Sequence, residues 1–338
     1  MSPIVSICIA NYNGIDLIDA CIASVRAQDC AFPVEIIVHD DASQDGSVAL
    51  IRARHPDVRL IEGPENVGFC IANNRMAAIA HGEYLLLLNN DAELLPDALR
   101  VLHLEAERLD RPAILSLPQF DFETRELIDR GCLLDPFFNP VPNLDPTRHE
   151  VAMVIGACLW IPKTLWDELD GFPEWFGSIA EDMYLCCVAR LADHPVRASE
   201  SSGYQHRVGA TFGGGKPTQD RSLVTTARRR RLSERNKCFV LILTCPAPYF
   251  YLLLPLHLIL LTIEGMLLAL AKNDWHIFEN IYLDCLRQLW QARSRLITKR
   301  ESIQAARKIT AGQYFHVFLS RHHKINLLFK HGLPHVKR

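Results

Sequence analysis

The chain has 338 residues, of which 49% are hydrophobic and 22% charged, enough for one large domain or two modest ones with a sizeable core. This composition excludes a disordered, fibrous or collagen-like protein. Eleven cysteines lie at scattered positions with no C-x-x-C pair. They argue against a disulfide framework and a structural zinc site, and they suit a reducing cytosol.

The charge is divided unevenly along the chain. Residues 1–227 hold 17 Lys and Arg and 33 Asp and Glu, a net charge of −16, whereas residues 228–338 hold 19 and 6, a net charge of +13. The acidic part is a poor nucleic-acid binder, so no nucleic-acid partner is expected. The basic, leucine-rich part favours contact with an anionic membrane surface. We expect no signal peptide, because the first apolar run is short and lacks a basic segment before it.

The first 115 residues alternate short apolar runs with helical patterns, which predicts an α/β fold with a Rossmann-like, mixed but mostly parallel sheet flanked by helices. The predicted strands are Ile4–Ile9, Val34–His39, Val58–Ile61, Tyr84–Leu88 and Ala113–Ser116, and the predicted helices are Asp16–Gln28, Asp45–Arg54, Cys70–Ala80 and Pro96–Arg108. Ligands of such sheets bind at the carboxyl ends of the strands. Polar clusters follow three of these strands: Asn11-Tyr-Asn-Gly14, Asp40-Asp-Ala-Ser43 and Asn89-Asn-Asp91.

The middle of the chain is less regular. Residues 117–150 are rich in Pro and Asp and predict a long excursion with a short hairpin. A strand over Val151–Ile161 and a short helix from Pro162 follow, and residues 172–192 predict a loop and then a helix. The glycine-rich residues 209–216 predict a mobile segment.

Two adjacent carboxylates, Asp40 and Asp41, end a predicted strand and need partners, because they repel each other. One interpretation is that one of them accepts a hydrogen bond from the ring N–H of a nucleotide base. The alternative is that Asp41 caps the next turn and helix, with Ser43 and Asp45 as further capping candidates.

Asp91 follows the most hydrophobic predicted strand. A carboxylate at the mouth of a buried strand suits Mn²⁺ or Mg²⁺, which prefer oxygen ligands and bridge diphosphate oxygens with one or two protein carboxylates. The alternative is an N-cap ahead of the helix predicted from Pro96.

Glu181 and Asp182 form a second carboxylate pair, at the start of a predicted helix. Such a pair can supply a general base, or it can simply compensate the helix dipole in the first turn. His206 follows the pair by one strand length and precedes the glycine-rich segment, although a lone histidine is more often structural than a ligand.

Taken in order from Ser6 to His206, these segments closely resemble a family 2 glycosyltransferase with the glycosyltransferase A (GT-A) fold, closest to the bacterial rhamnosyltransferase-like branch. The segments that carry the resemblance are Ile7-Cys-Ile-Ala-Asn-Tyr-Asn-Gly14, Val38-His-Asp-Asp-Ala-Ser-Gln-Asp-Gly-Ser47, Glu65-Asn-Val-Gly-Phe69 with Asn73-Asn74, Gly82-Glu-Tyr-Leu-Leu-Leu-Leu-Asn-Asn-Asp91, Gly156-Ala-Cys-Leu-Trp-Ile161, Gly171-Phe-Pro-Glu-Trp-Phe176 and Ala180-Glu-Asp-Met-Tyr-Leu185.

The resemblance implies an inverting enzyme that moves a sugar from a nucleoside-diphosphate sugar to a hydroxyl of a glycan or lipid-linked acceptor in cell-surface polysaccharide synthesis. It implies Asp182 as the general base, Glu181 orienting the loop or the acceptor, and Mn²⁺ or Mg²⁺ on Asp91 with His206. It also implies that Gly213-Gly-Gly215 closes over the donor. The residues implied to bind the nucleotide sugar are Ala10, Asn11, Tyr12, Asp40, Asp41, Asn73 and Asn90.

Three positions depart from the family pattern. Asn89 stands at the first position of the D-x-D metal motif, so Asp91 has to carry the metal with less help. Ala10 stands where many members have proline or valine, and Gly171-Phe-Pro replaces the frequent Gly-Phe-Asp.

From Arg228 the chain becomes basic and apolar, which predicts a catalytic domain over residues 1–227 and a helical, membrane-associating region over residues 228–338. The run Leu252–Leu270 has the length of a membrane span, but His257 and Glu264 interrupt it and share one helix face, with Lys272 nearly in line. We expect this helix to lie in the membrane interface, with a true span and a buried soluble helix as alternatives. The expected location is cytoplasmic, peripheral or monotopic on the inner face of the plasma membrane.

The sequence leaves two alternatives to the transferase. A nucleotidyltransferase of similar fold usually has a basic, glycine-rich triphosphate loop after its first strand, and Asn11-Tyr-Asn-Gly14 lacks a basic residue. A membrane-attached, non-catalytic binding protein on a decayed fold is disfavoured, because Asp41, Asp91, Asp182 and His206 are all retained.

Overall fold

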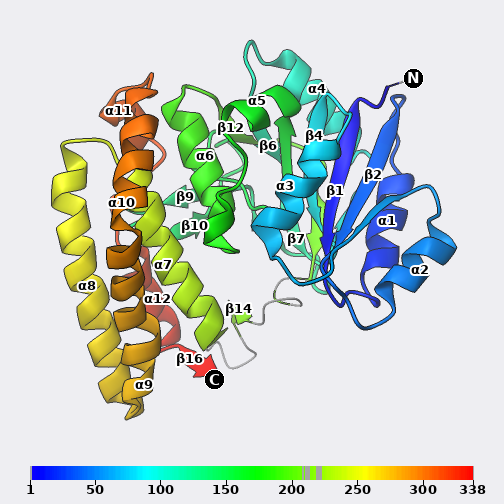
Figure 1. Cartoon of the computed structure of the whole chain (residues 1–338). Helices are drawn as coiled ribbons and strands as arrows, with labels where there is room; N and C mark the ends of the chain where they lie inside the picture. The colour runs from blue at the N-terminus through cyan, green and yellow to red at the C-terminus, as the bar shows by residue number, and fades with distance from the viewer. Residues whose placement is uncertain (1, 208, 210–213, 218–222, 338) are drawn as a thin grey trace. The chain divides into compact units, whose positions relative to one another are not determined.

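The computed structural model describes residues 2–207, 209, 214–217 and 223–337, and contacts divide the chain into two compact units (Figure 1). The sheet unit comprises Met1–Cys132, Pro142–Ala189 and His194–Arg207, within the described residues. The helical unit comprises Leu133–Val141, Arg190–Asp193 and Val208–Arg338, with the same restriction. The functional division at residue 227 stays a prediction.

The main sheet of the sheet unit has seven strands in the order β12-β6-β11-β4-β1-β2-β3. Only β11 runs antiparallel to its neighbours, which confirms the mixed, mostly parallel sheet. The central strand β4 is buried along almost its whole length, as a strand covered on both faces requires. The bounds are β1 Val5–Asn11, β2 Val34–Asp40, β3 Arg59–Glu62, β4 Tyr84–Asn89, β6 Ile114–Ser116, β11 Cys158–Pro162 and β12 Val196–Ala198.

The helices of the sheet unit follow the predicted alternation with strands. They are α1 Ile18–Arg26, α2 Ser47–Arg54, α3 Phe69–Ile79, α4 Ala98–Arg108, α5 Lys163–Glu168 and α6 Glu181–Leu191, with a short 3₁₀ turn η1 at Glu174–Phe176. Helix α3 packs on β1 and β2, and α1 packs on α2 and β5.

The strand predicted over Val151–Ile161 is wrong in its first half, because only Cys158–Pro162 forms a regular ladder, with β4. Before it, the backbone N–H groups of Ala152 and Met153 both donate to the carbonyl oxygen of Cys132, whereas that of Val151 donates to Val196. The apolar segment is therefore buried by contacts with two different partners, which apolar composition alone does not distinguish from a strand.

A second, four-stranded sheet has the order β5-β13-β7-β8, with β5 Ala92–Leu94, β7 Gln119–Asp121, β8 Leu127–Asp129 and β13 Tyr204–His206. The antiparallel pair β7–β8 confirms the hairpin predicted within residues 117–150. A short pair follows, β9 Cys132–Leu134 with β10 Pro140–Pro142. Strand β13 lies antiparallel to β5 and places His206 opposite Ala92, the residue after Asp91.

The helical unit begins with α7, whose N-terminus is capped by the Thr226 hydroxyl accepting from the Arg229 backbone N–H. Its helices are α7 Ala227–Thr244, α8 Tyr249–Lys272, α9 Trp275–Ile277, α10 Asp284–Ala305, α11 Ala311–Phe315 and α12 His323–His331, with a π-helical turn η2 at Phe278–Leu283 (Figure 1). A small sheet joins β14 Gly214–Pro217, β15 Leu223–Thr226 and β16 His335–Lys337. The long helical stretch predicted from Arg228 is confirmed.

Candidate active site

A buried hydrogen-bond network ties together the ends of β1, β2 and β4. The Asn11 amide nitrogen donates to Asp40 Oδ2 over 2.8 Å, and the Asn90 amide nitrogen donates to Asn11 Oδ1 over 2.8 Å. The other Asp40 oxygen accepts from the Ser43 backbone N–H. Because Asn11, Asp40 and Asn90 are at most 5% exposed, these side chains hold the loops at the strand ends in place. A direct contact of these three side chains with the donor stays a prediction.

Gly14 is required by this network, and sequence reasoning did not single it out. A Cβ at Gly14 would lie 2.3 Å from the Asn90 amide nitrogen and 2.4 Å from Asn11 Oδ1. The signal available in the sequence was the Asn-Gly pair that ends the first polar cluster.

Asp41 holds a distant loop rather than its own turn. Its two carboxylate oxygens accept the backbone N–H groups of Val67 and Gly68 over 2.7 and 2.9 Å. The capping interpretation of Asp41 is therefore wrong for the next helix, where Asp45 instead accepts from the backbone N–H groups of Ser47 and Ile15. The predicted bond from Asp41 to a nucleotide base remains open, since each carboxylate oxygen accepts more than one hydrogen bond.

Asp91 and His206 meet in the structure, although 115 residues separate them. Asp91 Oδ1 lies 3.0 Å from His206 Nε2, and the residues are 2% and 8% exposed. The pairing of β13 with β5 brings them together, and the Arg207 backbone N–H donates to the Asp91 carbonyl. The alternative of a helix N-cap at Asp91 is wrong, because α4 begins at Ala98 with Asp97 at its N-cap.

The Asp91–His206 pair fits a divalent cation in donor type and spacing. Two ligands that occupy adjacent corners of an octahedron at 2.0–2.1 Å from Mg²⁺ are about 3 Å apart. Within the described residues, no group of three or more His, Cys, Asp or Glu side chains is arranged to hold a metal. The remaining ligands would therefore come from the diphosphate and water.

Glu181 and Asp182 open α6 and have different surroundings. Asp182 Oδ2 accepts the Gly156 backbone N–H over 2.9 Å, and Oδ1 accepts that of Met183 over 2.7 Å. Glu181 is 6% exposed, and among the described residues its Oε2 has no hydrogen-bond partner. Burial and the neighbouring Asp182 charge raise the pKa of Glu181 to about 8, and burial raises the pKa of Asp182.

The backbone just before this pair is in an unusual conformation. Ile179 and Ala180 have φ angles of 71° and 67°, in the left-handed region that a β-branched residue rarely adopts. This conformation directs the chain into α6 so that Glu181 and Asp182 occupy its first turn. Strained backbone of this kind is common next to functional groups.

Asn73 and Asn74 are adjacent in α3 but bond different parts of the chain. The Asn73 side chain is 1% exposed and donates to the Phe69 carbonyl of its own helix over 2.9 Å, and its contact with the nucleotide sugar stays a prediction. Asn74, which was not predicted as a site residue, bonds both the backbone N–H and the carbonyl of Phe172, over 3.0 and 2.9 Å. It thereby fixes the Gly171-Phe-Pro turn.

The remaining predicted residues differ in exposure. The Tyr12 side chain is 44% exposed in the loop after β1, whereas Ala10 lies within β1, half-buried. Of the predicted lid, Gly213 lies outside the described residues, and Gly214 and Gly215 form part of β14.

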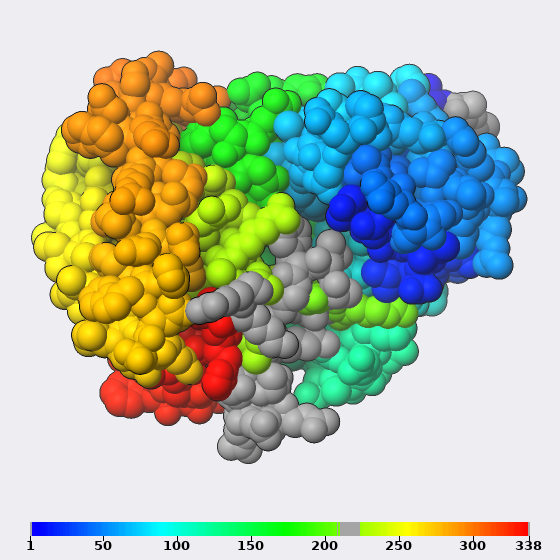
Figure 2. All heavy atoms as spheres, turned by 60° about the horizontal axis from the view of Figure 1, so that its bottom comes forward, coloured from blue at the N-terminus to red at the C-terminus, as the bar shows by residue number. Residues whose placement is uncertain are grey.

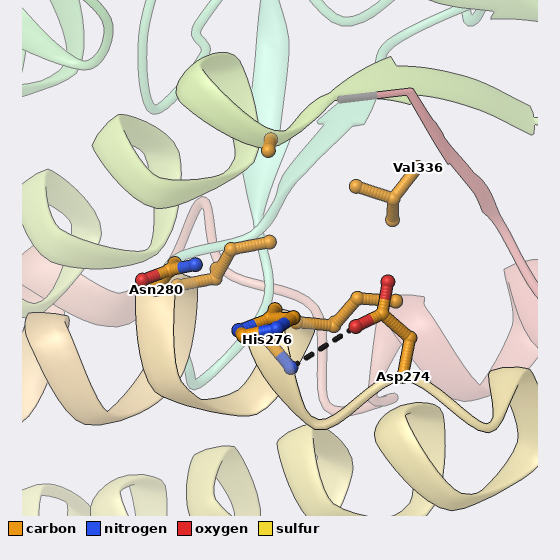
Figure 3. Close-up of a pocket in the computed structure, with 7 residues that line it drawn as sticks. Asp274, His276, Asn280 and Val336 are labelled. Atoms are coloured by element: carbon orange, nitrogen blue, oxygen red, sulfur yellow. Dashed lines mark hydrogen bonds between the residues drawn. The ribbon is translucent and has the colours of Figure 1, made fainter.

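A cavity of about 430 Å³ lies elsewhere, lined only by residues of the helical unit (Figure 3). Asp274 accepts the His276 backbone N–H there and so caps the short helix α9. None of the predicted site residues lines this cavity.

Comparisons with known proteins agree with the architecture. Residues 6–164 match the family model of glycosyl transferase family 2. Chondroitin synthase of Escherichia coli is 30% identical over 187 residues, which cover 54% of this chain and 26% of that protein. An N-acetylglucosaminyl-diphospho-decaprenol L-rhamnosyltransferase of Mycobacterium tuberculosis is 26% identical over 183 residues, which cover 45% of this chain and 60% of that protein. The chain spans about a third or less of the length of the first curated relatives it matches.

Solved structures share the fold at low sequence identity. The mannosyltransferase PcManGT of Pyrobaculum calidifontis, in complex with GDP-Man and Mn²⁺, has a TM-score of 0.52 and 17% identity. The alignment covers 90% of this chain and 86% of the mannosyltransferase chain. TarS of S. aureus, in complex with UDP-GlcNAc, has a TM-score of 0.54 and 15% identity, covering 89% and 90%. Residues 6–164 of this chain therefore match glycosyl transferase family 2, and they lie within a domain of the GT-A fold.

Proposed function

We propose that the protein is an inverting glycosyltransferase that moves a sugar from a nucleoside-diphosphate sugar to a hydroxyl group of a glycan or lipid-linked acceptor in cell-surface polysaccharide synthesis. The observation that carries the proposal is the buried Asp91–His206 pair at the carboxyl end of the central strand β4. In a mostly parallel sheet this is the edge where ligands bind.

The residues around the pair suit a nucleotide diphosphate. The Asn11–Asp40–Asn90 network fixes the loops that flank the strand ends, and Asp41 fixes the loop over Val67 and Gly68. Tyr12, which is exposed in the first of these loops, is available to pack against a base. Bound at Asp91 and His206, Mn²⁺ or Mg²⁺ would supply Lewis-acid stabilisation of the departing diphosphate.

We assign Asp182 as the general base that takes the proton of the acceptor hydroxyl. A carboxylate with a raised pKa is a stronger base than an exposed one, and the two backbone N–H groups fix its orientation. Attack of the acceptor oxygen on the anomeric carbon, opposite the leaving diphosphate, inverts the configuration in one displacement. Glu181, buried beside it, orients the loop or the acceptor.

The names of the relatives support the reaction class and the choice of donor. GalNAc-T7 is described with UDP, GalNAc and Mn²⁺, and PcManGT with GDP-Man and Mn²⁺. The rhamnosyltransferase of Mycobacterium tuberculosis acts, by its name, on a diphospho-decaprenol acceptor. By analogy, we place this protein on the cytoplasmic side of the plasma membrane, in contact with its surface.

A screen of donor hydrolysis tests the proposal. Purified full-length protein is incubated with UDP-, dTDP- and GDP-sugars, with Mn²⁺, with Mg²⁺ or with chelator, and free nucleotide diphosphate is measured. We expect release from one nucleotide class, dependent on metal and lost in Asp91→Asn. Failure to release diphosphate from any donor, together with no metal-dependent donor binding by calorimetry, would overturn the proposal.

A further inference from the structure

Helix α8 has two faces of opposite character. One face packs into the helical unit and holds the buried residues His257, Leu261, Gly265, Leu268 and Ala269. The other face is exposed. Its apolar residues recur at spacings of three and four, which places them in one continuous stripe along the helix. That stripe comprises Leu252 (67% exposed), Leu256 (41%), Ile259 (56%), Ile263 (46%), Met266 (43%), Leu267 (60%) and Leu270 (61%).

The polar side chains of α8 are used inside the unit. Glu264 accepts from Arg230 of α7 over 2.6 Å and from Lys324 of α12 over 2.7 Å, and the Tyr282 hydroxyl donates to it as well. His257 Nε2 lies 3.2 Å from Cys238 Sγ. The side chains of His257 and Glu264 therefore face neighbouring helices. The exposed residues of α8 between Leu252 and Leu270 are all apolar.

Helix α12 exposes apolar side chains of its own. Lys324 bonds Glu264 of α8, and the following turns expose Ile325 (49%), Leu328 (46%) and Phe329 (86%). Figure 2 shows atoms of the α8–α10 region, in yellow to orange, beside those of the C-terminal segment, in red. Together these exposed side chains of α8 and α12 are named the α8–α12 face.

The part of the chain that carries this face is basic. Residues 228–338 contain 19 Lys and Arg but 6 Asp and Glu. Two of the six acidic residues are neutralised internally, Glu234 by Lys237 and Lys324, and Glu264 by Arg230 and Lys324. Lys330 is exposed directly after Phe329. An apolar stripe with basic neighbours complements a bilayer whose headgroups are anionic.

We propose that the α8–α12 face binds the surface of an anionic lipid bilayer, with α8 lying in the plane of the membrane. At 24 residues α8 is long enough to cross, and among the described residues it is the one helix that passes that test. Crossing would however carry the ion-paired Arg230, Glu234 and Lys324 into hydrocarbon with it. Lying in the interface requires only that the apolar stripe enter about 5–10 Å. A second copy fits less well, because two basic units repel each other.

The inference rests on the proposed function for its purpose, since a lipid-linked acceptor is presented at this surface, but its test measures binding alone. Full-length protein is sedimented with sucrose-loaded vesicles of phosphatidylcholine containing about 30% phosphatidylglycerol. We expect binding that weakens with salt and with removal of phosphatidylglycerol, and that alkaline carbonate reverses.

Matched variants locate the binding surface. Leu267→Ser and Phe329→Ser remove exposed apolar side chains of the face, and each should weaken the partition coefficient about fivefold or more. Leu144→Ser, which removes a side chain 58% exposed in the sheet unit, should leave it unchanged. Because all three positions are exposed, the variants should keep the wild-type unfolding midpoint and donor hydrolysis rate.

Three results would overturn the inference. These are equal vesicle binding by Leu267→Ser, Phe329→Ser and Leu144→Ser, resistance of the bound protein to carbonate, and a stable dimer in light scattering that Leu267→Ser dissolves without any vesicle binding by the wild type. A protein that binds vesicles as described but releases no diphosphate would retain this inference and lose the proposed function.

Discussion

Glu181 and Asp182 are adjacent carboxylates whose surroundings favour different protonation states. Asp182 accepts two backbone N–H groups, which stabilise its charged form, whereas one oxygen of the buried Glu181 accepts no hydrogen bond from the part of the chain that the structure describes. We therefore expect Asp182→Asn to lower the transfer rate about 10²- to 10⁴-fold with donor affinity near wild type. Glu181→Gln should lower the transfer rate less than Asp182→Asn does. Steady-state rates with calorimetric donor affinities check this, and the reverse ranking would assign the base to Glu181.

The pH dependence follows from the same pair. A carboxyl group accepts a proton only when ionised, and the pKa of Glu181 is raised from 4.5 to about 8. The transfer rate of the wild type should therefore rise with pH as Asp182 ionises, at a higher pH than for an exposed aspartate, because burial raises the pKa of Asp182. Glu181→Gln removes the coupled carboxyl, so the rise should occur at lower pH. Rate profiles from pH 5 to 9 measure this, and identical profiles for the two proteins would contradict it.

As pH rises, the free energy of unfolding should change in the opposite direction to the transfer rate. Because the folded state favours protonated Glu181, its contribution to the free energy of unfolding is present below the ordinary pKa of 4.5 and is lost as pH rises toward 8. Glu181→Gln should remove this loss. Urea unfolding at several pH values tests the sign, and a wild-type stability that increases over this range relative to Glu181→Gln would show that Glu181 is ionised without cost.

At the scale of the elements, Gly14 allows the loop after β1 to approach Asn90 and Asn11 closely. Gly14→Ala places a methyl group 2.3 Å from the Asn90 amide nitrogen, which has to move and break the buried network. We expect a loss of about 1–3 kcal/mol in the free energy of unfolding and weaker donor binding.

Gly312→Ala is the matched control for this change. A Cβ at Gly312 meets only the Thr310 hydroxyl oxygen, at 3.9 Å, so its stability and donor affinity should stay near wild type. Denaturant unfolding and calorimetry compare the two variants. Equal behaviour of Gly14→Ala and Gly312→Ala would show that the network tolerates a side chain.

At the scale of the whole molecule, a partly buried ion network joins α7, α8 and α12 within the helical unit. Lys324 bonds both carboxylate oxygens of Glu234 over 2.9 Å and one of Glu264 over 2.7 Å, and the carboxylates raise its pKa well above the ordinary value. Lys324→Met leaves these acids short of a partner and should cost about 3 kcal/mol. Lys330→Met, on the exposed side of α12, should cost little. Urea unfolding monitored by circular dichroism compares the two variants. Similar unfolding midpoints for Lys324→Met and Lys330→Met would show that the network adds no stability.

Local sequence patterns predicted the alternation of strands and helices, the polar clusters at the carboxyl ends of the strands and the resemblance to family 2 glycosyltransferases. Burial on both faces leaves a continuous apolar run such as β4, and a helix leaves a period near 3.6, so both can be seen in one chain. The elements predicted over the first 115 residues are accordingly present, with no end shifted by more than two residues.

Which buried polar groups meet depends on the tertiary fold. Asp91 pairs with His206 from 115 residues away, Asp41 holds the backbone of Val67 and Gly68, and Asn73 turns toward its own helix. The tertiary fold also decides that His257 and Glu264 of α8 face inward. Periodicity reports that a residue is buried, whereas its hydrogen-bond partner depends on strand order and helix packing across long separations, and a local pattern carries no record of either.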